Sequence, residues 1–166
     1  MQPPRRPWCD FPDVLIHAAE SRVKQHSAYP AAKSGDAGAA LDLVREVFDD
    51  ALPDRLIALV VDRQPMLVSA HAYEREGVNA IPEVLADVMA ERLGWRVDGG
   101  VVQTNVVTHT GADGFGRLAR QPAFDGVVTA GAEYVMVDDF VGMGGTLANL
   151  RGHIESHGGR VLAAVV

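Results

Sequence analysis

Apolar runs of strand length and helix length alternate along the second half of the chain. Tyr134 to Val137 form an uninterrupted run of mostly β-favouring residues, which is typical of a strand buried on both faces of a parallel sheet. A helix is expected from about Leu147 to His157, because Gly158-Gly159 end it, and Arg160 to Val166 are expected to form the next strand. The sequence therefore predicts a βαβ unit near the carboxyl end.

A second strand–loop–helix unit is predicted in the middle of the chain. Leu56 to Val61 and Met66 to Ala70 are two short β-like runs. A strong amphipathic helix is expected from Ile81 to Leu93, ending at Gly94, and Val101 to Val107 are typical of a further strand.

The first 50 residues or so carry no strand signal. Met1 to Pro12 are expected to form a flexible or loosely docked arm, and Val14 to Gln25 have helix-compatible spacing. After a loop, a helix is expected over about Ala37 to Leu52, capped by Asp36. We therefore divide the chain into a helical cover, residues 1–55, and an α/β core, residues 56–166. The predicted core is a three-layer, mainly parallel sheet of four to six strands with helices on both faces.

The run at Tyr134 leads into two carboxylates and a glycine-rich turn. Asp138 and Asp139 stand at the carboxyl end of the predicted strand, where open α/β sheets bind ligands. Gly142, Gly144 and Gly145 permit close approach of backbone N–H groups to an anion, and Thr146 can cap the next helix or donate its hydroxyl. Paired acids beside such a turn suit the hydroxyls and the phosphate of a sugar phosphate.

Val135 to Thr146 resemble the signature of the type I phosphoribosyltransferases, which bind phosphoribosyl pyrophosphate (PRPP). The resemblance implies that Asp138 and Asp139 face the ribose hydroxyls and that the segment from Gly142 to Thr146 wraps the 5′-phosphate. Gly142 and Met143 depart from the small or hydroxylated residues usual there, which removes one or two side-chain contacts to phosphate.

By the same resemblance, two further segments would contact the diphosphate. The amides of Ser69, Ala70, His71 and Ala72, with Arg75 as a possible cation, follow the strand where the family binds pyrophosphate. Arg117 and Arg120 flank a glycine-rich segment that matches the position of the family's mobile loop, and either arginine could neutralise charge as the bond breaks. Surface arginines beside a loop are about equally compatible with no such role.

The resemblance implies an enzyme that transfers ribose 5-phosphate from PRPP to a nitrogen acceptor, a nucleobase, and releases pyrophosphate. Asp138 and Asp139, with Arg117 and Arg120, would be catalytic, and Mg²⁺ would be bound mainly through PRPP, so no protein metal cluster is expected. Phe140 and Val141 are equally suited to packing against the acceptor or to the core. Gly142 replaces the acid used with 6-oxopurines and lowers the odds of those acceptors.

Other interpretations stay open. One is a PRPP- or nucleotide-binding regulatory protein of the same fold without activity, and another is a metal-dependent or small-ligand α/β protein. The aspartates could also simply cap a helix, whereas a dinucleotide fingerprint is weakened by Leu147 at the third glycine position. His153 and His157 share a helix face but lack a third metal ligand in a recognisable pattern.

Composition limits the partners. The formal charge of −7 over 166 residues argues against nucleic acid, and no apolar run reaches the length of a membrane span. The single cysteine, Cys9, fits a reducing cytoplasm. The chain stops inside a predicted strand, so we expect either a shortened form or an edge covered by a second copy, and we predict a homodimer.

Overall fold

The computed structural model describes residues 5–71, 78–104, 122–140 and 144–166. Its helices are α1 (Glu20–Gln25), α2 (Tyr29–Lys33), α3 (Ala37–Val47), α4 (Leu52–Val60), α5 (Ile81–Leu93) and α7 (Gly145–Ser156). Its strands are β1 (Met66–Ser69), β2 (Val102–Gln103), β3 (Phe124–Asp125), β4 (Glu133–Val137) and β5 (Arg160–Val165).

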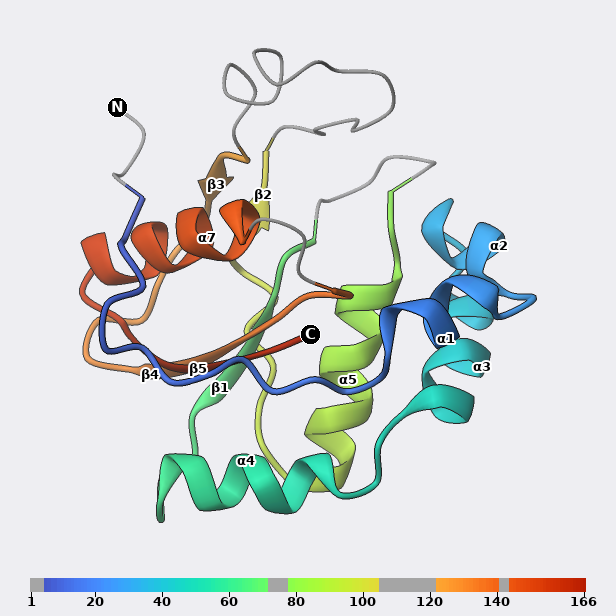
Figure 1. The fold of residues 1–166 in the computed structure, drawn as a ribbon. Helices are drawn as coiled ribbons and strands as arrows, with labels where there is room; N and C mark the ends of the chain where they lie inside the picture. The colour runs from blue at the N-terminus through green and yellow to red at the C-terminus, as the bar shows by residue number, and fades with distance from the viewer. Residues whose placement is uncertain (1–4, 72–77, 105–121, 141–143) are drawn as a thin grey trace.

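A three-stranded parallel sheet lies at the centre, in the order β1-β4-β5. Leu67 pairs with Val135 in one ladder, and Tyr134 pairs with Val161 in the other. The strands β2 and β3 form a separate two-stranded antiparallel sheet. Figure 1 shows α7 on one side of the parallel sheet and α5 on the other, with α1, α2 and α3 grouped beside α5.

The predicted fold class, a three-layer sheet of four to six strands, is wrong for the described residues. Leu56 to Val61, expected to be a strand, lie almost entirely in α4. The reason is visible in the spacing, since the buried residues Leu52, Leu56 and Val60 recur every four positions and Pro53 occupies the first turn. Val102 and Gln103 pair outside the main sheet, and residues 105–107 of that predicted strand lie outside the described residues.

Alternate residues of β4 supply the two halves of the core. Val135 and Val137 pack with the side chains of α3, α4 and α5, whereas Tyr134 and Met136 pack with those of α7. This alternation follows from the two-residue period of a strand, and the apolar character of both sets explains why β4 is the central strand.

The amino-terminal residues run along α7 and then along β5. Arg6 N–H donates to the Ala148 carbonyl at 3.4 Å, and Arg151 Nη1 donates to the Pro7 carbonyl at 3.2 Å. Further on, Leu15 N–H donates to the Ala164 carbonyl at 3.0 Å and forms a parallel bridge with Val165. Residues of this chain therefore cover the edge of β5, which removes the reason given for a homodimer; the homodimer itself stays a prediction.

Several helix bounds differ from expectation. The helix expected over Val14 to Gln25 begins only at Glu20, because Leu15 pairs with β5. Asp36 caps α3 as expected, accepting from Ala39 N–H at 2.9 Å, but the helix ends at Val47 rather than Leu52. The prediction of α5 is confirmed at both ends. In addition, α4 crosses the boundary drawn between residues 55 and 56.

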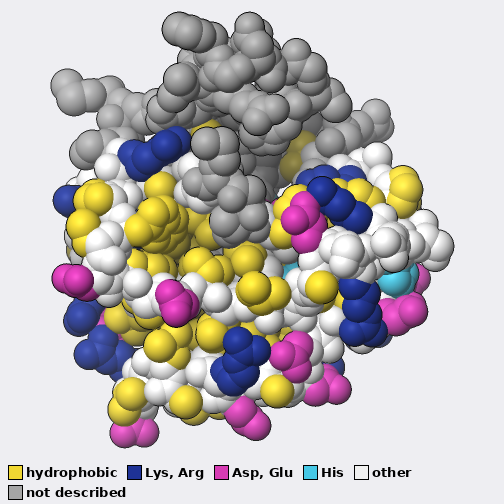
Figure 2. All heavy atoms as spheres, viewed as in Figure 1, with side chains coloured by type: hydrophobic (Ala, Val, Ile, Leu, Met, Phe, Trp, Pro, Cys, Tyr) yellow, Lys and Arg dark blue, Asp and Glu magenta, His cyan; other side chains and the backbone are white. Residues whose placement is uncertain are grey.

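On the face shown in Figure 2, basic and acidic side chains are interspersed around apolar ones. None of the helices in the described ranges combines the length and the apolar character that crossing a bilayer requires.

Candidate functional site

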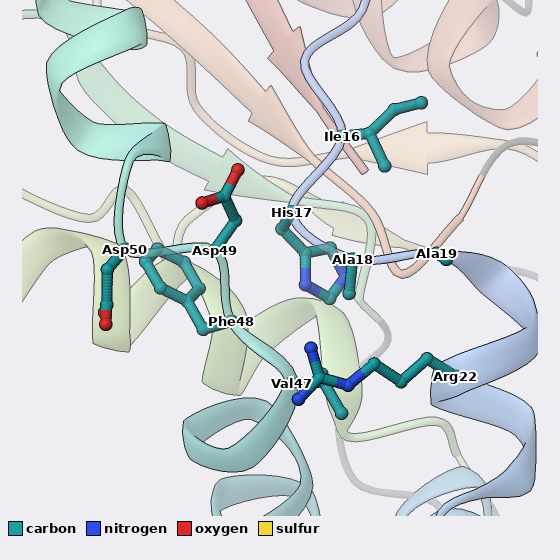
Figure 3. A pocket seen from close by; sticks show the side chains of 9 residues that line it. All are labelled: Ile16, His17, Ala18, Ala19, Arg22, Val47, Phe48, Asp49 and Asp50. Carbon is teal, nitrogen blue, oxygen red and sulfur yellow. The ribbon is translucent and has the colours of Figure 1, made fainter.

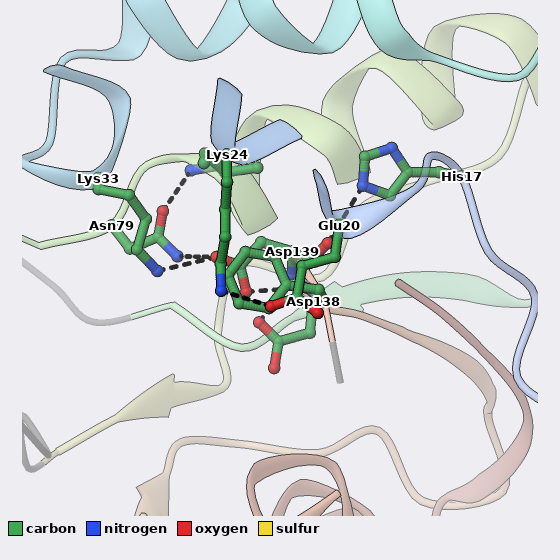
Figure 4. Close-up of polar contacts among 9 residues, drawn as sticks. His17, Glu20, Lys24, Lys33, Asn79, Asp138 and Asp139 are labelled. Atoms are coloured by element: carbon green, nitrogen blue, oxygen red, sulfur yellow. Dashed lines mark hydrogen bonds and ion pairs between the residues drawn. The ribbon is translucent and has the colours of Figure 1, made fainter. Parts of the chain in front are cut away.

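The candidate site lies at the carboxyl end of β4, where Asp138 and Asp139 follow the strand. Helical residues from the front of the chain meet the loop before α5 at this point, and Figure 4 shows their side chains converging on the two acids. Lys33 is the last residue of α2, and Asn79 precedes α5 by two positions. The sheet edge predicted from sequence to hold a ligand therefore carries a polar cluster.

Asp139 is the more enclosed acid, with 6% of its surface exposed. Its Oδ2 accepts from Lys33 Nζ at 2.9 Å and from Asn79 Nδ2 at 2.8 Å. Its Oδ1 accepts from Phe140 N–H at 2.9 Å. Both oxygens of this carboxylate are thus hydrogen-bonded within the protein, and its charge is compensated by an ammonium group.

Asn79 is held in a defined orientation. Its Oδ1 accepts from Ile81 N–H at 3.1 Å, at the first turn of α5. Because the oxygen faces that N–H, the amide nitrogen must point the other way, toward Asp139. The start of α5 therefore fixes a hydrogen-bond donor on the buried acid.

Asp138 has a different environment. Its Oδ1 accepts from Asp139 N–H at 2.9 Å, and no cationic side chain in the described part of the chain pairs with it. Burial raises the pKa of Asp138 well above its usual range, and the charge of Asp139 raises it further. The hydrogen bond from Asp139 N–H and, to a smaller extent, the charge of Lys33 oppose this rise. Asp138 is accordingly held toward its neutral, protonated form.

Two lysines flank the ring of Phe140. Lys24 Nζ lies 5.0 Å and Lys33 Nζ 5.3 Å from the ring centroid, within the range of a cation–π contact. Lys24 also forms an ion pair with Glu20, four residues earlier on α1. The cations near Phe140 are therefore each matched by a carboxylate, Glu20 for Lys24 and Asp139 for Lys33.

His17 connects the amino-terminal segment to the two acids. Its Nε2 lies 3.2 Å from the Asp139 carbonyl oxygen, and since a carbonyl only accepts, Nε2 carries the proton. Burial lowers the pKa of His17, more than the hydrogen bond to Asp139 raises it, so the ring is neutral. Its Nδ1 is then a buried acceptor without a partner among the described residues.

The residues predicted at the end of β1 have their side chains turned to internal contacts. Ser69 Oγ lies 2.8 Å from His71 Nδ1, and both residues are buried, as is Ala70. In the glycine-rich segment after the two acids, α7 begins at Gly145, and Gly144 has a φ of +70°. No side chain caps this helix, so the capping role suggested for Thr146 is not observed.

A Cβ on Gly144 would lie 3.5 Å from Trp8 Nε1, and one on Gly145 would lie 3.0 Å from Arg5 Nη2. The amino-terminal arm thus packs against the start of α7. The other predicted site residues lie outside the described residues: Val141, Gly142, Met143, Ala72, Arg75, Arg117 and Arg120.

Sequence reasoning missed Lys33, Asn79 and His17. Asn79 had a detectable signal, because an Asn just before an amphipathic helix is a helix-start residue. Lys33 is 106 positions from Asp139, and nothing in its local pattern indicates that contact.

Within the part of the chain that the structure describes, the donors near the two acids do not make up a metal site. No group of three or more His, Cys, Asp or Glu side chains capable of holding a metal occurs in the described ranges. Both oxygens of Asp139 are occupied, which leaves Asp138 alone as an acidic ligand. Magnesium bound mainly through a ligand stays a prediction.

The chain matches parts of two longer curated proteins. It is 44% identical over 162 residues to Protein TraN of Escherichia coli, covering 98% of this chain and 36% of that protein. It is 37% identical over 151 residues to an uncharacterized protein of Haemophilus influenzae, covering 90% of this chain and 34% of that protein. No protein-family model matches the chain.

These relatives overturn the expected function. Neither is named as a phosphoribosyltransferase, a glycosyltransferase or a PRPP-binding protein, although the match to Protein TraN extends over nearly the whole chain. The predicted phosphoribosyl transfer and its regulatory alternative are therefore wrong, together with the predicted enzyme class. The chain spans about a third of the length of both relatives. Cytoplasmic location and the absence of nucleic-acid or membrane partners stay predictions.

Proposed function

We propose that this chain is a small-molecule-binding domain that holds an uncharged, hydroxylated ligand against Asp138 and performs no group transfer. The observation that carries the proposal is the contrast between the two adjacent acids. Both carboxylate oxygens of Asp139 accept hydrogen bonds, from Lys33 and Asn79 on one and from Phe140 N–H on the other. Asp138 accepts one backbone hydrogen bond, its side chain also interacts with that of Asp139, and no cation pairs with it in the described part of the chain.

The charge around Asp138 favours an uncharged ligand. Lys33 is matched by Asp139, and Lys24 is matched by Glu20. These two pairs are each neutral, and the protonated form that the raised pKa of Asp138 favours would add no charge to them. A highly charged ligand would then gain little from them, whereas an uncharged one would not have to lose ionic hydration.

A protonated carboxyl group suits a hydroxyl group. It donates one hydrogen bond and accepts others, which matches the donor and acceptor capacity of an alcohol. A site that hydrogen-bonds a hydroxyl discriminates against an analogue that lacks it, because the half-buried carboxyl then loses that partner. The position at the carboxyl ends of parallel strands is where α/β sheets bind small ligands.

The experiment uses isotope-labelled protein and four probes: glycerol, myo-inositol, D-glucose and, as a probe without hydroxyl groups, dioxane. The Asp138 side-chain carboxyl carbon and the amide signals of Asp139 and Phe140 are followed by NMR during titration. We expect saturable shifts with at least one polyol and none with dioxane. Affinity should fall as pH rises through the pKa of Asp138, because the ionised carboxylate cannot donate.

Two variants test the role of Asp138. Asp138→Ala should weaken polyol binding by up to about tenfold, since a hydrogen bond contributes about 0.5–1.5 kcal/mol and about 1.4 kcal/mol corresponds to tenfold. Asp138→Asn, which keeps one donor and one acceptor, should bind without the pH dependence. Asp54→Ala on α4 is the control. Saturable polyol binding that is equal in Asp138→Ala and in the control, or no binding by any polyol, would contradict the proposal.

A further inference from the structure

A pocket separate from the acid cluster opens between the amino-terminal segment and the link from α3 to α4. Its volume is about 560 Å³, in the range of small-ligand sites. Figure 3 shows the side chains that line it. They are Ile16, His17, Ala18, Ala19, Arg22, Val47, Phe48, Asp49 and Asp50.

Five of the nine lining residues are apolar, and four are polar or charged. Val47 and Phe48 are buried, and Ile16 is exposed over 56% of its surface, which is high for a large aliphatic side chain. His17 is wholly buried, and its ring forms part of the wall. The backbone behind the pocket is fixed, because Asp49 N–H donates to the His17 carbonyl at 2.9 Å.

The charged groups of the pocket differ in how they are compensated. Asp49 accepts from Ala51 N–H at 3.0 Å and pairs with Arg55 at 3.3 Å. Asp50 pairs with Arg92, whose guanidinium lies 4.7 Å from the ring of Phe48. Both acids of the wall therefore already have cationic partners.

Arg22 is the exception among the lining residues. Its Nη2 donates to the Glu46 carbonyl at 3.0 Å, and no carboxylate in the described ranges pairs with it. The Glu46 carboxylate pairs instead with His26 at 2.8 Å. The remaining N–H groups of the guanidinium are thus available beside an apolar wall, which is the arrangement that recognises a carboxylate attached to an apolar body.

We propose that this pocket binds a small carboxylic acid with an apolar body, its carboxylate on Arg22 and its body against Ile16, Val47 and Phe48. The site is independent of the polyol site proposed at Asp138. The two sites are next to each other at His17, which lines the pocket and whose Nε2 donates to the Asp139 carbonyl.

The test uses phenylacetate as the probe, with phenylacetamide and 2-phenylethylamine as matched neutral and cationic compounds. Titration is followed by amide NMR signals of residues 16–22 and 47–50. We expect saturable shifts there with phenylacetate and at least about tenfold weaker binding of the other two compounds. Equal binding of phenylacetate and phenylacetamide, or tighter binding of the amine, would overturn the assignment of a carboxylate to Arg22.

Two variants make the test specific. Arg22→Ala should weaken phenylacetate binding by about tenfold, and Ala19→Trp should block it by filling the mouth of the pocket. Arg45→Ala, an exposed arginine of α3 outside the pocket, is the control and should bind as the wild type does. Absence of saturable phenylacetate binding to the folded wild-type protein, or unchanged binding in Arg22→Ala, would refute the site irrespective of polyol binding at Asp138.

Discussion

The pairing of Asp139 predicts that Asp139→Asn destabilises the protein far more than Asp138→Asn. An asparagine at position 139 loses the charge that compensates Lys33. It also turns a nitrogen toward one of the donors that now reach the carboxylate, those of Lys33, Asn79 and Phe140. One donor is therefore left without an acceptor, and water can hardly replace it because only 6% of the surface of Asp139 is exposed.

The magnitude follows from the exposure of the two partners. Removing one partner of a fully buried ion pair costs about 3–5 kcal/mol. The Lys33 side chain is 36% exposed and can turn partly to water, which lowers the cost. We therefore expect a loss of about 2–3 kcal/mol in the free energy of unfolding for Asp139→Asn.

Urea unfolding at pH 7, followed by circular dichroism, measures both variants under one condition. Asp138→Asn should be neutral or stabilising, because it replaces a carboxyl that already prefers the uncharged form. The reasoning would be refuted if Asp139→Asn unfolded within about 0.5 kcal/mol of the wild type, the usual range for surface substitutions, or if Asp138→Asn were the more damaging change.

Further predictions concern pH and backbone geometry. The raised pKa of Asp138 contributes stability that is present at low pH and lost as the pH rises through the folded-state pKa. The free energy of unfolding of Asp138→Asn, measured by urea melts across pH 4 to 8, should therefore increase relative to that of the wild type as the pH rises. The lowered pKa of His17 acts in the opposite sense: its contribution to stability is present above about pH 6.5 and is lost as the pH falls. In His17→Gln, the free energy of unfolding should therefore decrease less steeply as the pH falls below this value. Gly126→Ala should cost more than about 3 kcal/mol, because its Cβ would lie 1.9 Å from the Gly100 carbonyl oxygen at a φ of +115°. Gly131→Ala is the matched control, because its φ is +78° and no atom lies within 4 Å of the added Cβ; it should cost only about 1–2 kcal/mol. Equal losses of stability in the two glycine variants would show that the contact with Gly100 is unimportant.

The elements predicted correctly from sequence are those with their own end signals. For α5, Pro82 stands in the first turn and Gly94 adopts the left-handed conformation at the end. The strand β4 was found because its apolar run is buried on both faces. By contrast, the sequence of α4 predicts a strand, since a short apolar run without its helical context is compatible with either structure.

The candidate site was predictable only in part. The sequence predicts Asp138 and Asp139 directly after a buried strand, and the structure confirms this position after β4. The partners of Asp139 come from α2 and from the residue before α5, and such contacts depend on how the front helices pack, which local pattern does not record. The phosphoribosyl interpretation treated the two acids alike because their sequence context is the same.

The fold separates the two acids through the alternation of β4. Val137 packs on the side of α3 and α5. Asp139, two residues later, lies on the same side and contacts Lys33 and Asn79. Met136 packs on the α7 side, and the two-residue period of the strand directs Asp138 to that same side. The helical front of the chain thus compensates one carboxylate and leaves the other without a cation.

This division makes Lys33 a remote determinant of the proposed ligand site. Its ammonium group lowers the pKa of Asp138 slightly while it pairs with Asp139. Lys33→Met should therefore raise the pKa of Asp138 further, which a carbon-detected NMR titration of the Asp138 carboxyl measures. The substitution should also extend polyol binding to higher pH, because the protonated donor persists there. A pKa of Asp138 that stays unchanged or falls in Lys33→Met would show that the two acids are not coupled through Lys33.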